Sequence, residues 1–359
     1  MGDARGTSAH LIINPASGSA GVLLRKLTRA ARERGIRARV LSLGEDARHA
    51  AIEAADDGAR ELAVAGGDGS AAAVAGVAAE RGLPLAVVPT GTLNHFARDL
   101  GLDVARPLYA LEAFDPGRHE LRVDLGLING RPFINNVSLG IYAEMLGDPG
   151  YRNDKLRVAQ AKLRAVFSDP QRRRALRITP PGGAPLESVV AVVVSNNPYE
   201  FVRWETFGRR QRLDSGKLQV SVVDAGTLDE LERLLAGALL GAIEFRPALR
   251  HWTSERLETG RLGEVVRAGV DGEPVALEAP LRFSVDPGAL RVLVPGGSPA
   301  SRQAPRLEAG WHAARTLSRW LRPTPTAYED PRRSDADSST VHANSGNPRH
   351  RTWIDQRCC

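Results

Sequence analysis

Three short segments of the chain combine glycine with hydroxyl or amide side chains, and each follows a run of apolar residues typical of a β-strand. They are Asn14-Pro-Ala-Ser-Gly18, Gly66-Gly-Asp-Gly-Ser70 and Pro89-Thr-Gly-Thr-Leu-Asn94. Loops at the carboxyl ends of neighbouring parallel strands open on one crevice, which is where open sheets bind their ligands. We therefore expect the three segments to form one site.

The middle segment has the composition of a phosphate-binding loop. Its three glycines permit backbone angles and a close approach that a Cβ would block, and Ser70 opens a predicted helix whose free N–H groups attract phosphate. Asp68 places an acid inside this anion site, which is explained if Mg²⁺ or a bound water bridges its carboxylate to the phosphate. A tight strand-to-helix turn without any ligand is the alternative interpretation.

The elements that carry these loops alternate between strand and helix from His10 to Val88, the pattern of βαβ units in a parallel sheet. The expected strands are His10–Asn14, Ala38–Leu43, Leu62–Ala65 and Leu85–Val88. The expected helices are Val22–Arg34, Asp46–Asp57 and Ser70–Arg81. We predict an open, doubly wound α/β domain over residues 8–122.

The helical rhythm stops after about Val123, and alternating apolar segments predict an antiparallel β-sandwich domain over residues 123–296. Its expected strands include Phe133–Ser138, Val189–Ser195, Leu218–Val223, Leu281–Val285 and Ala289–Val294. Helical inserts are expected at Asp154–Phe167 and Leu228–Ile243. A closing helix at Leu307–Leu321, within residues 297–322, and a disordered tail over 323–359 complete the predicted chain.

Bulk properties limit the classes of protein to which the chain can belong. A length of 359 residues with 42% hydrophobic content suffices for two cores. The net charge of +6 favours acidic partners, such as nucleotides, nucleic acid or anionic lipid surfaces. The longest apolar run, Leu234–Ile243, is too short to cross a bilayer, and Met1–His10 has no signal-peptide pattern. The two cysteines, Cys358 and Cys359, are adjacent and form no disulfide framework. We expect a cytoplasmic protein.

Several phosphate-binding classes are excluded by missing motifs. The chain has no Walker sequence, no protein-kinase His-Arg-Asp loop, and no Gly-x-Gly-x-x-Gly after its first strand. The segments that are present resemble the diacylglycerol kinase catalytic family, which includes sphingosine, ceramide and bacterial lipid kinases. Besides the three loops, the resemblance rests on Val123-Asp124, Asp214-Ser-Gly-Lys-Leu218 and Asp271-Gly-Glu273. It extends from about residue 8 to residue 295.

The resemblance implies an enzyme that uses ATP and Mg²⁺ to phosphorylate a lipid hydroxyl, with its active site between an ATP-binding domain and a lipid-binding sandwich. It assigns nucleotide contacts to Asn14, Pro15, Ser17, Gly18, Gly66, Gly67, Asp68, Gly69, Ser70, Gly91, Thr92 and Asn94.

The catalytic acids implied by the resemblance are Asp68, Asp124, Asp271 and Glu273. The family's Asp-Gly-Glu motif supplies the general base, which here is Asp271 or Glu273, and Asp124 would orient that base or a bridging water. An Asp-Gly hairpin turn without chemistry is the alternative for this motif.

The chain departs from the family pattern at three positions. Ser70 replaces the usual threonine and keeps the hydroxyl, and His95 replaces an acid, where we interpret it as a helix residue rather than a base. At the segment where relatives hold a second, structural Mg²⁺, Ser215 replaces one of two acids. Asp214 alone makes a weak site for this hard cation.

Two segments are candidates for contact with lipid. The predicted helix Asp154–Phe167 has an apolar stripe and several basic residues, so it either lies in a headgroup layer or packs on the sandwich. Between two predicted strands, aromatic residues interleave with arginines, a mixture suited to a membrane interface and also to single-stranded nucleic acid. This mixture comprises Tyr199, Phe201, Arg203, Trp204, Phe207, Arg209 and Arg210. We expect a peripheral membrane protein that binds no nucleic acid and forms a homodimer through exposed sandwich strands.

Three other functions remain open. A kinase of a soluble acceptor, similar to NAD kinase, shares the Gly-Gly-Asp-Gly loop, and a catalytically dead member would bind nucleotide or lipid only. A basic nucleic-acid-binding protein would explain the net positive charge but none of the motifs. The sequence does not identify the acceptor, because the shape of a binding pocket selects it.

Overall fold

The structure of the chain is a computed structural model, which describes most residues between 9 and 298. It describes residues 9–148, 150, 154–168, 178–186, 189–200, 209–231, 248–260 and 263–298. Several expectations lie outside these ranges, namely most of the Leu228–Ile243 helix, the aromatic residues between 201 and 208, the Leu307–Leu321 helix and the tail over 323–359. Residues 228–231 are helical.

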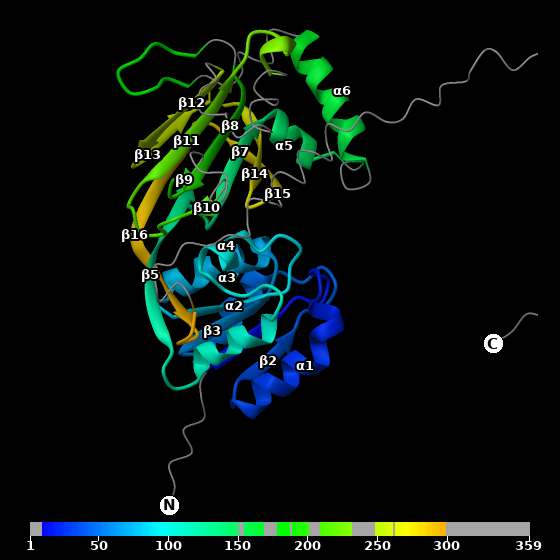
Figure 1. Ribbon diagram of the computed structural model, residues 1–359, viewed down its shortest axis with the longest axis vertical. Coiled ribbons are helices and arrows are strands. Elements are labelled where there is room, and N and C mark those ends of the chain that lie inside the picture. Colours follow the sequence, from blue (N-terminus) through cyan, green and yellow to red (C-terminus); the bar gives the residue numbers. More distant parts are fainter. Residues whose placement is uncertain are drawn as a thin grey trace, which may run out of the picture. The chain divides into compact units, whose positions relative to one another are not determined.

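Four parallel strands form the first part of the fold, in the spatial order β2-β1-β3-β4 (Figure 1). They are β1 (Ala9–Ile13), β2 (Arg37–Val40), β3 (Glu61–Gly66) and β4 (Leu85–Pro89). The helices are α1 (Ala20–Glu33), α2 (Ala47–Asp56), α3 (Asp68–Glu80), α4 (His95–Asp99) and the 3₁₀ helix η1 (Pro107–Phe114). The expected strands and helices are confirmed to within a few residues at their ends.

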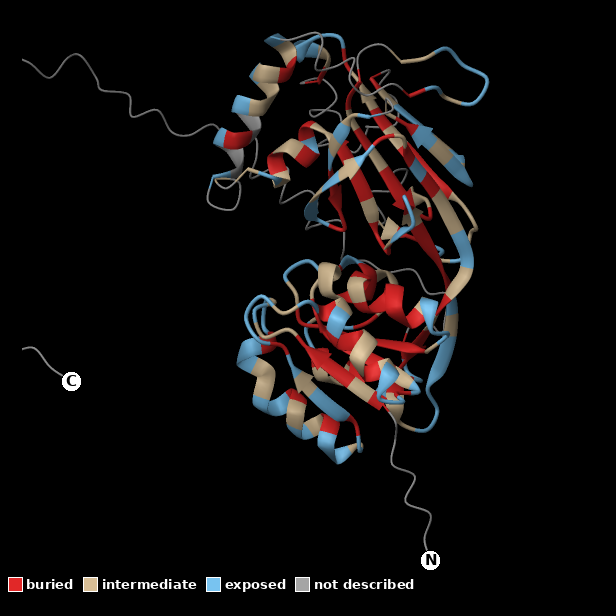
Figure 2. Cartoon of the chain, turned by 180° about the vertical axis from the view of Figure 1, so that it is seen from behind, coloured by how far each residue is buried: buried red, intermediate tan, exposed pale blue. Residues whose placement is uncertain are grey.

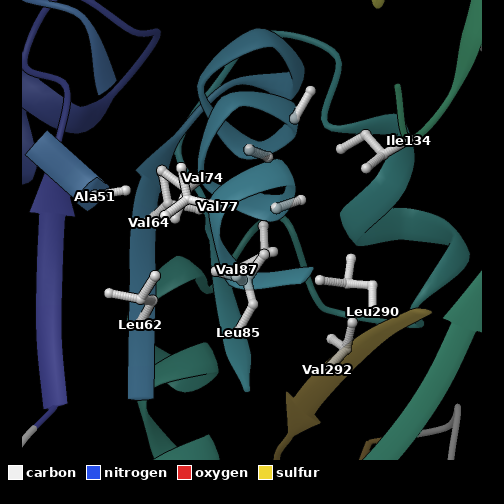
Figure 3. Packing of buried hydrophobic residues seen from close by; sticks show 14 of the residues in the cluster. Ala51, Leu62, Val64, Val74, Val77, Leu85, Val87, Ile134, Leu290 and Val292 are labelled. Carbon is white, nitrogen blue, oxygen red and sulfur yellow. The ribbon is translucent and has the colours of Figure 1, made fainter. Parts of the chain in front are cut away.

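Alternation along the buried strands places helices on both faces of this sheet. Leu62 and Val64 pack with residues of α2 and α3, whereas Ala63 and Ala65 pack with α1 and η1. Figure 3 shows the first of these cores. Figure 2 shows that the central strands are buried while α1 exposes its outer surface. The doubly wound α/β architecture predicted from the sequence is confirmed.

Two long strands extend this sheet. Val292 of β16 (Leu281–Val294) pairs in parallel with Leu85 of β4, and β16 then runs antiparallel to β5 (His119–Ile128). β5 spans the expected boundary between residues 122 and 123. The prediction of two strands at Leu281–Val285 and Ala289–Val294 was wrong. Pro287 and Gly288, the latter with φ +62°, form an irregularity inside one strand instead of a turn between two.

A second, antiparallel sheet has the order β12-β11-β8-β7-β14-β15. Its strands are β7 (Asn136–Gly140), β8 (Val189–Asn196), β11 (Leu218–Asp224), β12 (Leu249–Ser254), β14 (Val265–Val270) and β15 (Glu273–Glu278). Buried residues of this sheet share a core with Ile128 of β5 and with Leu281 and Phe283 of β16. The antiparallel β architecture predicted for this part of the chain is confirmed. Its hydrophobic core contains residues of the second sheet and of the long strands β5 and β16.

The shorter strands complete this part of the fold: β6 (Arg131–Phe133), β9 (Tyr199–Glu200), β10 (Arg209–Arg210) and β13 (Arg256–Thr259). The single strand expected at Phe133–Ser138 was wrong. The chain forms β6, leaves the first sheet at Ile134 and Asn135, and enters β7 of the second sheet. Apolar residues stand on both sides of this crossing, so the segment resembles one strand although two adjacent asparagines, Asn135 and Asn136, lie within it.

Helix α6 (Lys155–Ser168) forms where it was expected, next to an unexpected short helix, α5 (Ile141–Leu146). Val158 and Val166 are buried in a core with Ile141 and Met145, and Leu163 and Phe167 pack against the same core. These residues of α6 therefore pack on the protein. This agrees with the interpretation in which the helix packs on the sandwich rather than lying in a headgroup layer. No helix among the described residues has the length and apolarity needed to cross a bilayer.

Candidate active site

The three glycine-containing loops meet at the carboxyl edge of the parallel sheet. The N–H of Ser19 donates to the carbonyl of Thr90 at 2.7 Å, and the N–H of Gly91 donates to the carbonyl of Gly66 at 3.1 Å. The amide nitrogen of Asn14 donates to the hydroxyl of Ser70 at 3.0 Å. The structure thus brings together the segments that the sequence predicts to share a site.

Two glycines make this close approach of backbones possible. A Cβ on Gly18, whose φ is +51°, would lie 2.2 Å from the carbonyl oxygen of Thr90. A Cβ on Gly91 would lie 2.4 Å from the Cα of Gly67. Ser17 lies nearby, with its hydroxyl oxygen 3.0 Å from the place of a Cβ on Gly67, and Pro15 belongs to the same turn.

Helix α3 begins at Asp68, two residues earlier than expected, so the loop itself forms the helix N-terminus. Within the described part of the chain, the backbone N–H groups of Asp68, Gly69 and Ser70 have no hydrogen-bond partner. Unpaired N–H groups at the start of a helix point along its axis and attract anions. This loop can therefore hold a phosphate group.

The carboxylate of Asp68 is engaged by the protein. It accepts hydrogen bonds from the N–H groups of His95 and Phe96, both at 3.1 Å, and from the amide nitrogen of Asn135 at 3.0 Å. Asp68 thereby satisfies the first N–H groups of α4, which a nearby acid stabilises. The protein thus supplies partners that explain an acid at this position, and a contact of Asp68 with Mg²⁺ or a bridging water stays a prediction.

The rest of the third loop shapes the backbone around α4. The side chain of Asn94 accepts from the N–H of Gly91 at 2.9 Å and donates to its carbonyl at 2.7 Å, and Asn94 has a φ of +52°. Asn94 therefore closes the loop, while Thr92 is exposed. His95 is the first residue of α4, which confirms its interpretation as a helix residue.

The Asp-Gly-Glu motif forms a two-residue hairpin turn between β14 and β15. Asp271 and Gly272 have φ values of +49° and +86°, and Val270 pairs with Glu273. Such a turn requires positive φ at both central residues, which Asp-Gly tolerates well. The motif is therefore a hairpin turn, and this turn also carries its acids to the phosphate loop.

Asp271 is buried and fully engaged. Its carboxylate accepts from the backbone N–H groups of Ile134, Asn135 and Asn136 at 2.9, 2.7 and 3.1 Å. Burial and the negative charge of Asp68 raise the pKa of Asp271 to about 6, against the three N–H groups that lower it. With its oxygens occupied in this way, Asp271 is poorly placed to receive a proton from a ligand.

Glu273 is exposed and lies directly against the phosphate loop. A Cβ on Gly69 would be 3.1 Å from its Oε1 atom and 3.2 Å from its Cγ atom, so the missing side chain of Gly69 makes room for it. No hydrogen bond or ion pair engages its carboxylate among the residues that the structure describes. Of the two candidate bases, Glu273 has the free carboxylate.

Asp124 and Asp214 lie in other surroundings. Both carboxylate oxygens of the buried Asp124 accept backbone N–H groups, from Gly216 at 2.7 Å and from Gly288 at 2.9 Å. These bonds tie the loop before β11 to the irregularity in β16, and no hydrogen bond joins Asp124 to the Asp-Gly-Glu turn in the described ranges. Asp214 is exposed and pairs with Arg212 at 3.0 Å.

The described residues contain no group of three or more His, Cys, Asp or Glu side chains that could hold a metal ion. Mg²⁺ usually keeps several waters and is held by one or two carboxylates together with the phosphates of a nucleotide. The open carboxylate of Glu273 and the carboxylate of Asp68, both beside the phosphate loop, fit a metal that arrives with its nucleotide. The weak structural site at Asp214 stays a prediction, since the residues that the structure describes give Asp214 an ion pair with Arg212 and no such group of acids.

Sequence reasoning missed a buried polar network beside this site. Arg210 is 4% exposed and donates to Asp99 at 2.7 Å, to the side-chain oxygen of Asn135 at 2.7 Å and to the carbonyl of Asn196 at 2.9 Å. Asn135 in turn reaches Asp68. Two adjacent asparagines inside the apolar run from Phe133 to Leu139 were the sequence signal, because buried amides need partners.

Comparison with known proteins identifies the family of this chain. The model of the diacylglycerol kinase catalytic domain matches residues 8–128. A protein of Pseudomonas aeruginosa (strain UCBPP-PA14) named Probable lipid kinase YegS-like is 31% identical over 268 residues, which cover 73% of this chain and 85% of the relative. A protein of Mycobacterium tuberculosis (strain CDC 1551 / Oshkosh) named diacylglycerol kinase is 26% identical, with 70% of this chain and 82% of the relative covered.

Among solved structures, a diacylglycerol kinase from Bacillus anthracis str. Sterne has the same fold, with a TM-score of 0.55 at 18% identity, over 81% of this chain and 98% of that one. The family model and the named relatives point to the same family. This chain belongs to the diacylglycerol kinase family of lipid kinases, which transfer phosphate to an alcohol group.

Proposed function

We propose that this protein transfers the γ-phosphate of ATP, bound with Mg²⁺, to the hydroxyl group of a lipid, with Glu273 as the general base. The observation that carries the proposal is the contact of the free Glu273 carboxylate with Gly69 of the phosphate loop. A base must lie within hydrogen-bond reach of the proton that it removes, and a group beside the transferred phosphate meets that requirement.

The phosphate side of the reaction is supported by the N-terminus of α3. Its free N–H groups are suited to phosphate oxygens, and Asn14 holds the hydroxyl of Ser70 at the same loop. Bound Mg²⁺ would neutralise part of the charge on the phosphates, with Asp68 and Glu273 as the nearby carboxylates. Asp68 would at the same time keep α4 against the loop.

The proposed transfer uses one proton and one phosphoryl group. Glu273 takes the proton of the lipid hydroxyl while the hydroxyl oxygen forms a bond to the γ-phosphorus. The bond from that phosphorus to the bridging oxygen breaks, and ADP leaves with the electron pair. Asp271, held by three N–H groups, fixes the turn that presents Glu273.

A lipid acceptor is supported by the family and by the relatives that are named lipid kinases. The hydroxyl of such a lipid lies at the surface of a bilayer, so the proposal includes peripheral association with the membrane on the side where ATP is available. The expected homodimer stays a prediction. Diacylglycerol is the first acceptor to test, followed by sphingoid bases, phosphatidylglycerol and polyprenols.

The test compares transfer of labelled γ-phosphate into organic-extractable lipid by the parent, by Glu273→Gln and by Glu278→Gln, in mixed micelles of each lipid class. Glu278 is exposed at the other end of β15 and serves as the matched control. We expect the Glu273→Gln rate to fall by about 100-fold to 10,000-fold, the usual contribution of a general base, while Glu278→Gln matches the parent.

Three results separate the parts of the proposal. An active Glu273→Gln variant would overturn the assignment of the base while leaving the lipid kinase activity in place. No labelled lipid of any class from a parent that binds ATP would overturn the lipid acceptor. Labelled NADP from added NAD in that case would establish the soluble-acceptor alternative.

A further inference from the structure

Asn135 lies where the chain crosses from the first sheet to the second, between β6 and β7. Its side chain is 2% exposed and is engaged at both ends. The amide nitrogen donates to the carboxylate of Asp68 at 3.0 Å, and the amide oxygen accepts from Arg210 at 2.7 Å.

The two partners leave the amide a single orientation. A carboxylate at neutral pH only accepts hydrogen bonds and a guanidinium only donates them, so the nitrogen must face Asp68 and the oxygen must face Arg210. Arg210 is itself fixed by Asp99 and by two backbone carbonyls, including that of Asn196, and it lies 5.6 Å from the ring of Tyr199. A buried amide held this way has little freedom to move.

The backbone of the same segment holds the turn that bears the proposed base. The N–H groups of Ile134, Asn135 and Asn136 bind the carboxylate of Asp271, two residues before Glu273. Ile134 is fully buried in the core that α2 and α3 form with the parallel sheet, as Figure 3 shows. One anchored tripeptide therefore contacts both Asp68 of the phosphate loop and the Asp-Gly-Glu turn.

We infer that Asn135 is a positioning residue of the phosphotransfer site, which fixes the phosphate loop relative to Glu273 through Asp68, and that Arg210 holds its amide for this task. The inference rests on the proposed function, because it assigns a role in the reaction to a residue that touches neither substrate. The inference requires that the distance between the phosphate loop and the Asp-Gly-Glu turn depends on the Asn135 side chain.

The variant Asn135→Asp isolates one end of this bridge. The oxygen facing Arg210 is retained with nearly the same shape, while the donor to Asp68 becomes a second carboxylate oxygen at the present distance of 3.0 Å. Like charges at this distance repel, and the loop must move away or one acid must take up a proton. Asn135→Ala removes both ends without adding charge. Asn197→Asp is the matched control, since Asn197 is fully buried and binds Ser215 instead.

The experiment measures kcat and the KM for ATP and for lipid in these variants, together with their melting temperatures. We expect kcat to fall at least about 10-fold in Asn135→Ala and further in Asn135→Asp, because small misplacements of reacting groups are costly. The KM for lipid should stay within about 3-fold of the parent in the same comparison. Asn197→Asp should keep the parent kcat.

The kcat per folded molecule is a readout that a loss of stability alone would not move. Unfolding removes active molecules without changing this kcat, whereas a displaced phosphate loop lowers it.

Parent kcat per folded molecule in both Asn135 variants, with lower melting temperatures only, would overturn the inference and leave the proposed function intact. An inactive parent would instead count against the proposed function. If Asn135→Ala fails to fold, the kcat and KM values of Asn135→Asp, measured against the parent, decide the question.

Discussion

Replacement of Gly91 by alanine tests whether the phosphate loop and the third loop touch as the structure describes. The new Cβ would lie 2.4 Å from the Cα of Gly67 and 3.1 Å from its nitrogen. Carbon atoms in favourable contact are about 3.5 Å apart, so the two loops would have to separate by about 1.1 Å. Both Gly67 atoms belong to the backbone, so no side-chain rotation can relieve these contacts, and the new Cβ would also lie 2.9 Å from the Oδ1 atom of Asn94.

The cost follows from that displacement. Overpacking a closely packed site costs about 1–3 kcal/mol of unfolding free energy, and a 1 Å misplacement of reacting groups can lower a rate about 100-fold. We expect Gly91→Ala to lower the melting temperature, to weaken binding of Mg-ATP, and to reduce kcat for lipid phosphorylation by about 100-fold. Fluorescence-monitored thermal unfolding, calorimetric titration with Mg-ADP and the lipid assay measure these effects.

Gly147→Ala is the matched control. Gly147 also has an ordinary negative φ, but its Cβ would meet only carbonyl oxygens at 3.7 Å and beyond, an ordinary contact distance. This variant should match the parent in all three measurements. If Gly91→Ala also matched the parent, the contact between the two loops would be refuted, and with it the single phosphate site built from them.

Three further predictions follow from the acids of the site. Gly69→Ala should leave the melting temperature unchanged and reduce kcat about 10-fold, because its Cβ displaces only the flexible Glu273 side chain from the loop; an unchanged kcat would argue against Glu273 as the base. The raised pKa of Asp271, about 6 against an ordinary 3.8, means that the folded protein binds this proton more tightly than the unfolded chain. The stabilisation of the folded state by this proton is therefore complete below about pH 3.8 and is lost as the pH rises through about 6. From about pH 5 to about pH 7.5, denaturant unfolding should show a loss about 1 kcal/mol larger in the parent than in Asp271→Asn, and equal losses would contradict the raised pKa. Asp124→Asn should cost about 1–3 kcal/mol in denaturant unfolding, since one N–H loses its acceptor, while the pH profile of kcat stays that of the parent; a shifted profile would show that Asp124 acts on the base.

Much of the fold could be predicted from local pattern. Parallel strands buried on both faces, such as β3 and β4, read as short apolar runs between amphipathic helices, and turn residues marked their ends. The errors occurred where the pattern continued through a change of sheet. Phe133–Leu139 has apolar residues on both sides of the crossing between sheets, and Pro287-Gly288 suggests a turn although the strand continues through it.

The candidate site was predictable as a set of loops and only partly as a set of roles. The topology rule for open sheets brings Gly18, Gly66 and Gly91 to one edge, and the structure places them in contact. The rule cannot say which of two acids keeps a free carboxylate. That choice depends on the three N–H groups that occupy Asp271 and on the space above Gly69 that admits Glu273.

The strands and helices of the parallel sheet, the phosphate loop and the family to which the motifs point could be predicted from the sequence, because each depends on neighbours within a few residues. Tertiary structure alone decided what Asp68, Asp124 and Asn135 do, because their partners are between 27 and 164 residues away along the chain. Hydrogen bonds of buried polar groups are satisfied by whatever the fold brings near, and a local pattern contains no record of that partner.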